Sequence, residues 1–163
     1  MNKALSLDQN SPDVYQTLAS VRLSQSRTQE AQVAIEKSMS IWFELDANDE
    51  LWPSYANRTS LVKLLIELGL YDRALQILQL QQSEDDEDPE IWYLFGWCYY
   101  LIGGFESNDA PTLGSESAED ASECFQTVLM LHDKFGTVQE DMLQHSKELL
   151  KIVDPQHAIT AWF

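Results

Sequence analysis

The side chains best suited to chemistry are the rings of residues 89–104, which read PEIWYLFGWCYYLIGG. Six of these sixteen residues are aromatic, and none after Glu90 is charged. Tyr93, Trp97 and Tyr100 stand at i, i+4 and i+7, so on a helix they share one face. Aromatic faces attract Lys and Arg cations by about 0.5–2 kcal/mol. The acidic run SEDDED precedes the stretch at residues 83–88, and three interpretations are open: a membrane span, a buried helix or a binding groove.

The length of the stretch argues against a membrane span. Residues 91–105 are fifteen residues without a charge, whereas a transmembrane helix needs about 20. The run also contains the pair Gly103 and Gly104, and its tyrosines are polar. It is therefore interpreted as one helix of a soluble core.

The charge balance limits the partners. The chain has 163 residues, of which 44% are hydrophobic, with 10 basic and 27 acidic residues and a net charge of −17. Such a surface repels the phosphates of nucleic acids and anionic membranes, and it attracts basic proteins. Solubility alone is an equally open reading of this charge. We expect no direct nucleic-acid partner and no membrane partner.

No set of residues indicates catalysis or metal binding. The histidines His132, His145 and His157 lack metal-ligand spacing, and the chain has no HExxH, GxSxG or glycine-rich phosphate motif. The acidic run lacks the spacing and the glycine of an EF-hand. Cys98 and Cys124 form no CxxC, so we expect them to be reduced and buried. The sequence thus predicts a protein that is not an enzyme and has no metal or cofactor.

Apolar residues recur at steps of three and four along most of the chain, which predicts helices. No segment alternates apolar and polar residues as a half-buried strand would. The predicted fold class is all-α. The apolar series that support it include residues 31, 35, 39 and 42, residues 61, 64, 65 and 68, and residues 138, 142, 149 and 152.

The predicted helices carry a repeat pattern. Residues 92–99 read WYLFGWCY and fit the pattern W-x₂-L-G-x₂-Y with Phe95 in place of Leu, while Ala121 and Phe125 supply A-x₃-F. The chain resembles the tetratricopeptide repeat family over most of its length. This resemblance implies a right-handed solenoid of antiparallel helix pairs, with small residues where helices cross and Gly96 in close contact with another helix. A non-repeating helical bundle is the alternative.

Two further alanines mark weaker copies of the repeat. Ala31 lies sixteen residues after Tyr15, and Ala74 lies sixteen after Arg58. Ala121, by contrast, lies 29 residues after Trp92, so thirteen extra residues separate the helices of the third repeat. The predicted organisation is the end of a preceding repeat at 1–11, repeat one at 12–46, repeat two at 54–82, repeat three at 89–133 with an inserted surface loop at 103–118, and a closing helix at 137–153.

The first residues are expected to continue a helix that begins upstream. Ala4, Leu5 and Leu7 stand where the second helix of a preceding repeat would end. We therefore expect the sequence to be either a fragment that lacks earlier repeats or the product of a gene model that misses the true N-terminus.

The family resemblance also implies a binding surface. In these repeats the first helix of each pair lines a concave groove, and no basic clamp for an acidic peptide tail is expected here because Lys63 stands alone. An alternative is that the inserted loop folds back over the aromatic face. The predicted partner-binding residues are Gln16, Ser20, Lys63, Glu67, Glu90, Tyr93, Trp97 and Tyr100.

A narrower resemblance rests on DPEIWYLFGWCYY at residues 88–100 and the acidic loop that follows. These residues are similar to those of fungal tetratricopeptide chaperones dedicated to one ribosomal protein, the fourth of the large subunit. The resemblance implies capture of a basic, Lys/Arg-rich ribosomal protein and its escort from cytoplasm to nucleus for ribosome assembly. The alternative is a scaffold subunit of a multiprotein complex.

Overall fold

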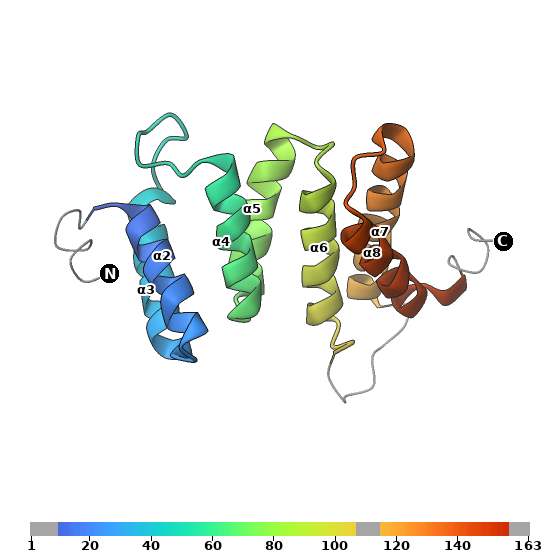
Figure 1. Cartoon of the computed structure of the whole chain (residues 1–163), viewed down its shortest axis with the longest axis horizontal. Coiled ribbons are helices and arrows are strands. Elements are labelled where there is room, and N and C mark those ends of the chain that lie inside the picture. Colours follow the sequence, from blue (N-terminus) through green and yellow to red (C-terminus); the bar gives the residue numbers. More distant parts are fainter. Residues whose placement is uncertain (1–9, 107–114, 157–163) are drawn as a thin grey trace. The chain divides into compact units, whose positions relative to one another are not determined.

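The computed structural model describes residues 10–106 and 115–156, and these residues form helices, turns and loops but no strand. The all-α class predicted from the sequence is confirmed. The predicted helix end at 1–11 lies almost wholly outside the described residues. The described helices (Figure 1) are α2 (Pro12–Ser24), α3 (Thr28–Trp42), α4 (Tyr55–Glu67), α5 (Tyr71–Glu84), α6 (Pro89–Ile102), α7 (Glu116–Phe135) and α8 (Glu140–Val153).

The chain divides into two compact units between Arg73 and Ala74. We call the part up to Arg73 unit 1 and the part from Ala74 unit 2. Unit 1 contains α2, α3 and α4, unit 2 contains α6, α7 and α8, and α5 begins in unit 1 and continues into unit 2. None of the described helices is long and apolar enough to cross a membrane.

Unit 1 is built on the packing of α3 against α2, which also lies beside α4. Ala19 and Ala31 are completely buried, and small residues allow two helices to approach closely. Ser38 on α3 donates a hydrogen bond of 2.6 Å to the carbonyl of Pro12, at the start of α2. The repeat signature Ala31 therefore occupies a helix crossing.

The long connection from α3 to α4 has a small core of its own. The ring of Trp52 meets Trp42 edge-on, with centroids 4.8 Å apart. The guanidinium of Arg58 lies 5.9 Å from the Trp52 ring and 5.7 Å from the Tyr55 ring, and its Nε donates to the carbonyl of Pro53. These contacts account for the extra residues between Ala31 and Ala74, since the longer connection packs rather than projecting as a simple loop.

Unit 2 has α7 packed against both α6 and α8. A Cβ atom added to Gly96 would lie 2.6 Å from the ring of Phe125, so any other residue at this crossing of α6 and α7 would force that ring to shift. Cys98 and Cys124 are both buried free thiols, as predicted. Burial raises the pKa of each thiol to about 12.

The helix ends in unit 2 follow local signals. Asp88 caps α6 by accepting a hydrogen bond from the Glu90 backbone N–H. Ser115 caps α7, which begins at Glu116. This start lies inside the segment that the sequence predicted as the loop 103–118. Residues 107–114 of that segment lie outside the described part. Gly136 ends α7 with a positive φ of 66°, and α8 begins at Glu140 where the sequence predicted a start at 137.

Candidate partner-binding face

The three predicted rings of α6 lie together on one face, as their spacing requires. Trp97 and Tyr100 are stacked, with centroids 5.4 Å apart and planes 13° apart. Tyr100 also stacks on Phe105, just after the helix, at 5.3 Å. Trp97, Tyr100 and Phe105 thus form a continuous stack towards the C-terminal end of α6, while Tyr93 lies one turn earlier on the same face.

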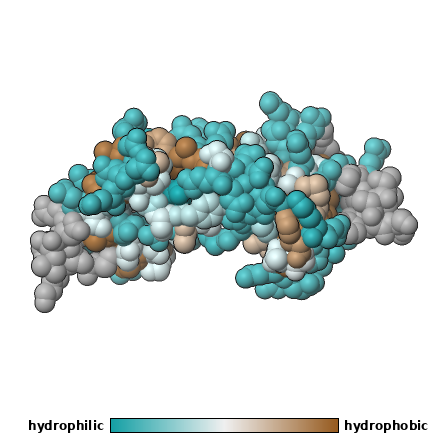
Figure 2. Space-filling model, turned by 90° about the horizontal axis from the view of Figure 1, so that it is seen from above, coloured by the Kyte–Doolittle hydropathy of each residue, from teal (hydrophilic) through white to brown (hydrophobic). Residues whose placement is uncertain are grey.

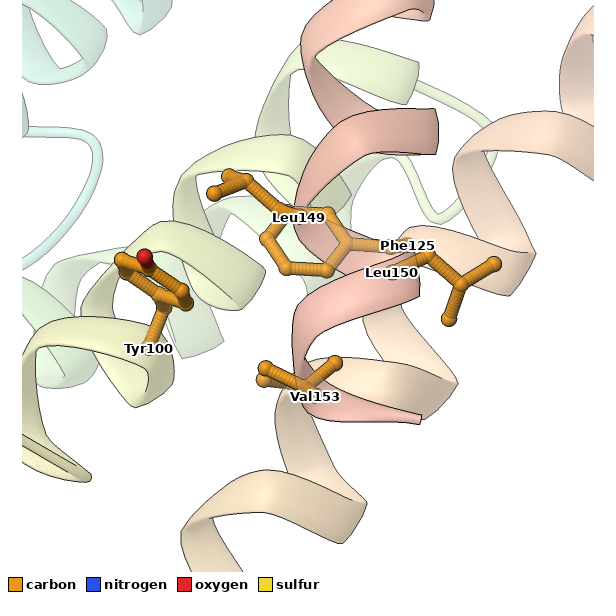
Figure 3. Packing of buried hydrophobic residues seen from close by; sticks show 6 residues of the cluster. Tyr100, Phe125, Leu149, Leu150 and Val153 are labelled. Atoms are coloured by element: carbon orange, nitrogen blue, oxygen red, sulfur yellow. The ribbon is translucent and has the colours of Figure 1, made fainter. Parts of the chain in front are cut away.

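Helix α8 packs against this aromatic face. The hydroxyl of Tyr93 is 2.6 Å from Nδ1 of His145 on α8, and the His145 ring is 5.3 Å from that of Trp97. Further along α8, Leu149, Leu150 and Val153 share a core cluster with Tyr100 and Phe125 (Figure 3). The face is therefore an internal contact as well as a predicted binding surface.

The extent of this cover differs among the three rings. Tyr100 is 3% exposed, whereas Tyr93 and Trp97 remain half-buried. Burial raises the pKa of Tyr93, so its hydroxyl stays protonated where it meets His145. Burial, together with the nearby Glu106 carboxylate, raises the pKa of Tyr100. Partner contact by these rings stays a prediction, and only Tyr93 and Trp97 retain appreciable surface for it in this conformation.

The sequence analysis considered the inserted loop as a cover for the aromatic face of α6, but it did not consider α8. Phe105 does belong to that predicted loop, so a small part of the cover comes from it. His145 was considered only as a possible metal ligand. The signal that could have identified it is its position on the apolar face of α8, three residues after Met142 and four before Leu149.

The acidic run before α6 is fixed by two contacts from other segments of unit 2. The indole Nε1 of Trp92 donates 2.8 Å to the carbonyl of Asp86. Lys134, near the end of α7, forms a 2.8 Å ion pair with Glu87. Residues 84–87 are exposed, while Asp88 and Glu90 are half-buried at the start of α6. The run therefore begins in the last turn of α5 and continues as a solvated loop at a defined position on unit 2.

The predicted residues of unit 1 lie on α2 and α4, which are neighbours. Gln16 is 9% exposed and donates through Nε2 to the carbonyl of Asn57 at 2.9 Å. Asn57, which sequence reasoning missed, donates in turn to Asp13 at 3.2 Å. Ser20, Lys63 and Glu67 are exposed. Gln16 thus joins the two first helices, and the other three side chains remain accessible.

The described residues contain no cluster of three or more His, Cys, Asp or Glu side chains able to hold a metal ion. His132 and His145 lie on α7 and α8, whereas His157 is outside the described part. Hydrophilic residues cover much of the face seen in Figure 2, with smaller hydrophobic areas between them.

Paired helices with small buried residues at their contacts are the arrangement of a helical-repeat fold. No protein-family model matches the chain. The chain is 34% identical, over 96% of its length, to the probable assembly chaperone of rpl4 from Emericella nidulans, of which it covers 43%. It is 35% identical, over 93% of its length, to the protein of the same name from Schizosaccharomyces pombe, of which it covers 46%.

A solved structure agrees with these relatives. The assembly chaperone of RpL4 (Acl4, residues 1–338) is similar with a TM-score of 0.62 and 38% identity, over 64% of this chain and 37% of that chain. The predicted resemblance to this group of chaperones is confirmed. The chain spans less than half the length of the curated relatives it matches. These relatives are named as chaperones and not as enzymes, which fits a protein without catalysis.

Proposed function

We propose that the chain is part of a chaperone that captures a ribosomal protein of the rpl4 type and escorts it for ribosome assembly. The observation that carries this proposal is the similarity of 93–96% of the chain to two probable assembly chaperones of rpl4. The all-helical repeat fold supports it, because stacked helix pairs provide extended surfaces for a partner protein.

The client segment is extended and rich in Lys and Arg. A net charge of −17 attracts such a segment and raises its encounter rate. The same charge disfavours direct contact with nucleic acid or an anionic membrane. Since ribosomal proteins are made in the cytoplasm and assemble with rRNA in the nucleus, the chaperone acts in both compartments.

The contact residues are those on the first helices of each pair. In unit 2, Trp97 and Tyr93 supply ring surface next to the acidic residues 84–88 and Glu90. In unit 1, Ser20, Lys63 and Glu67 supply polar contacts on α2 and α4, and the buried Gln16 holds α2 against α4 through its bond to Asn57. Tyr100 acts mainly by holding Trp97 in its stacked orientation.

Binding kinetics with the rpl4 protein of either fungus test the proposal. We expect a complex whose association slows as salt rises, since the Debye length is about 8 Å at physiological salt. Trp97→Ala should mainly speed dissociation, because it removes a short-range ring contact. Asp85→Asn with Asp86→Asn should mainly slow association, because it weakens the long-range field.

A charge-matched control separates the acidic run from general acidity. Glu140→Gln with Glu148→Gln removes two exposed carboxylates from α8 and should slow association less. Absence of binding to rpl4, or equal binding to polylysine, would overturn the proposal. Recovery of the chain only in a large, salt-stable assembly would instead favour the scaffold alternative.

A further inference from the structure

Unit 1 contains a pocket that shares no residue with the predicted first-helix surface. Its volume is about 220 Å³, and it is lined by α3 and the two residues that follow it, by Leu65 of α4, by Leu70 before α5 and by Arg73 of α5. The pocket thus lies on the side of unit 1 formed by second helices. Neither the function proposed above nor the named relatives assign a role to it.

The floor of the pocket is apolar. Ile35 and Leu65 are completely buried and Met39 nearly so. An apolar cavity of about 150 Å³ is enough to hold a benzene molecule, so this one has room for the methylene stem of a long side chain. Lys and Arg characteristically bury such stems while their charged ends stay near water.

The rim of the pocket is suited to a cation. Glu36 and Glu44 are exposed carboxylates on either side of Phe43 in sequence, and both line the pocket. The guanidinium of Arg73 already lies 5.9 Å from the Phe43 ring centroid. Two carboxylates and one guanidinium line the pocket, so its lining carries an excess negative charge, and the Phe43 ring face already has a cation over it.

We propose that this pocket takes one Lys or Arg side chain of the basic partner, as a second contact beyond the first-helix surface. The stem lies on Ile35, Met39 and Leu65, and the cation lies between Glu36 and Glu44 at the Phe43 ring. Arg73 occupies the ring face until the partner displaces it. This inference rests on the proposed function for the source of the side chain.

The test uses a Lys/Arg-rich peptide from rpl4 and the same peptide with every Arg replaced by citrulline and every Lys by acetyl-lysine. With ¹³C-methyl-labelled protein, only the charged peptide should shift the methyl signals of Met39 and Leu65 saturably. Glu36→Gln with Glu44→Gln should weaken its binding about three- to tenfold, as loss of cation contacts does. The α8 control, Glu140→Gln with Glu148→Gln, should weaken it less.

Arg73→Gln gives the sharper result, because removal of the resident guanidinium should tighten peptide binding severalfold. Lys151→Gln on α8 makes the same charge change in unit 2 and should tighten it less. The proposed role of the pocket would be overturned if Arg73→Gln and Lys151→Gln had equal effects on peptide binding. It would also be overturned if the Met39 and Leu65 methyl signals of the parent protein did not shift. Either result would leave the proposed function standing. If the parent protein binds neither peptide nor rpl4, both proposals fail. Circular dichroism of each variant checks that it is folded.

Discussion

The first helices of the two units expose very different faces. In unit 1, α2 and α4 present polar side chains, with Ser20, Lys63 and Glu67 exposed. In unit 2, the corresponding face of α6 is a stack of rings, and α8 packs against it through His145 and Leu149. The same repeat positions therefore serve an accessible polar surface in one unit and a largely covered aromatic one in the other.

The difference shows that a repeat position does not fix a residue's exposure. An aromatic face is costly to leave in water, at roughly 25 cal/mol per Å² of apolar surface, so a neighbouring amphipathic helix packs on it. A polar face gains little from the same packing and stays solvated. Variants that act on one face and not on the other can test this comparison.

Leu150→Ala should have the largest effect. Leu150 is completely buried in the cluster that α8 shares with α6 and α7, and such substitutions cost about 2–5 kcal/mol. Urea unfolding followed by circular dichroism measures the loss. Ile152→Ala is the control on the same helix, since Ile152 is 44% exposed and should cost much less.

Thiol labelling shows whether the Leu150→Ala substitution opens unit 2, because both cysteines lie in that unit. Their pKa values of about 12 leave the thiolate scarce at pH 8 in the folded protein, and the thiolate is the reactive form. Leu150→Ala should therefore speed labelling by a disulfide reagent and Ile152→Ala should not. Equal labelling rates for the two variants would contradict the packing described for α8.

Gly96→Leu should come next. A Cβ at this position meets the Phe125 ring at 2.6 Å, and overpacking of a core costs about 1–3 kcal/mol. Adding Phe125→Leu makes room, so the double variant should lose less than the sum of the two single variants. Additive losses would show that the side chain at position 96 does not press on Phe125.

Tyr93→Phe should have a moderate effect. It removes the hydroxyl that contacts His145 and leaves the ring in place, and a hydrogen bond contributes about 0.5–1.5 kcal/mol. Tyr71→Phe in unit 1 is a control on another half-buried tyrosine. Thermal unfolding compares them, and a larger loss for Tyr71→Phe than for Tyr93→Phe would count against a role of the hydroxyl in holding α8.

Local sequence patterns were sufficient for much of this fold. Apolar residues at steps of three and four predicted the helices, and the WYLFGWCY motif predicted that Gly96 meets another helix, as its contact with Phe125 confirms. Ala31, Ala74 and Ala121 are completely buried. These features depend on side-chain size and helical period, which the sequence displays directly.

The environment of the aromatic face could not be predicted in the same way. The i, i+4, i+7 spacing gave the shared face of Tyr93, Trp97 and Tyr100, but spacing within one helix cannot reveal which later segment packs on it. His145 lies 52 residues from Tyr93, and a contact of that separation depends on the path of the chain. The pocket beside Phe43 has the same origin, because Arg73 reaches it from a different helix.

The smallest effect is expected for the exposed residues of unit 1. Ser20→Ala and Glu67→Ala each remove a solvated side chain from the first-helix face, and surface substitutions away from packed contacts usually change stability by less than about 0.5 kcal/mol. Alanine is the best helix former, so Ser20→Ala on α2 can even stabilise slightly. We therefore expect the double variant to melt within a few degrees of the parent protein while its binding to rpl4 weakens.

A loss of stability comparable to that of Leu150→Ala would mean that the face of unit 1 is also an internal contact. The contrast between the two units would then be wrong, because both faces would serve packing before they serve a partner.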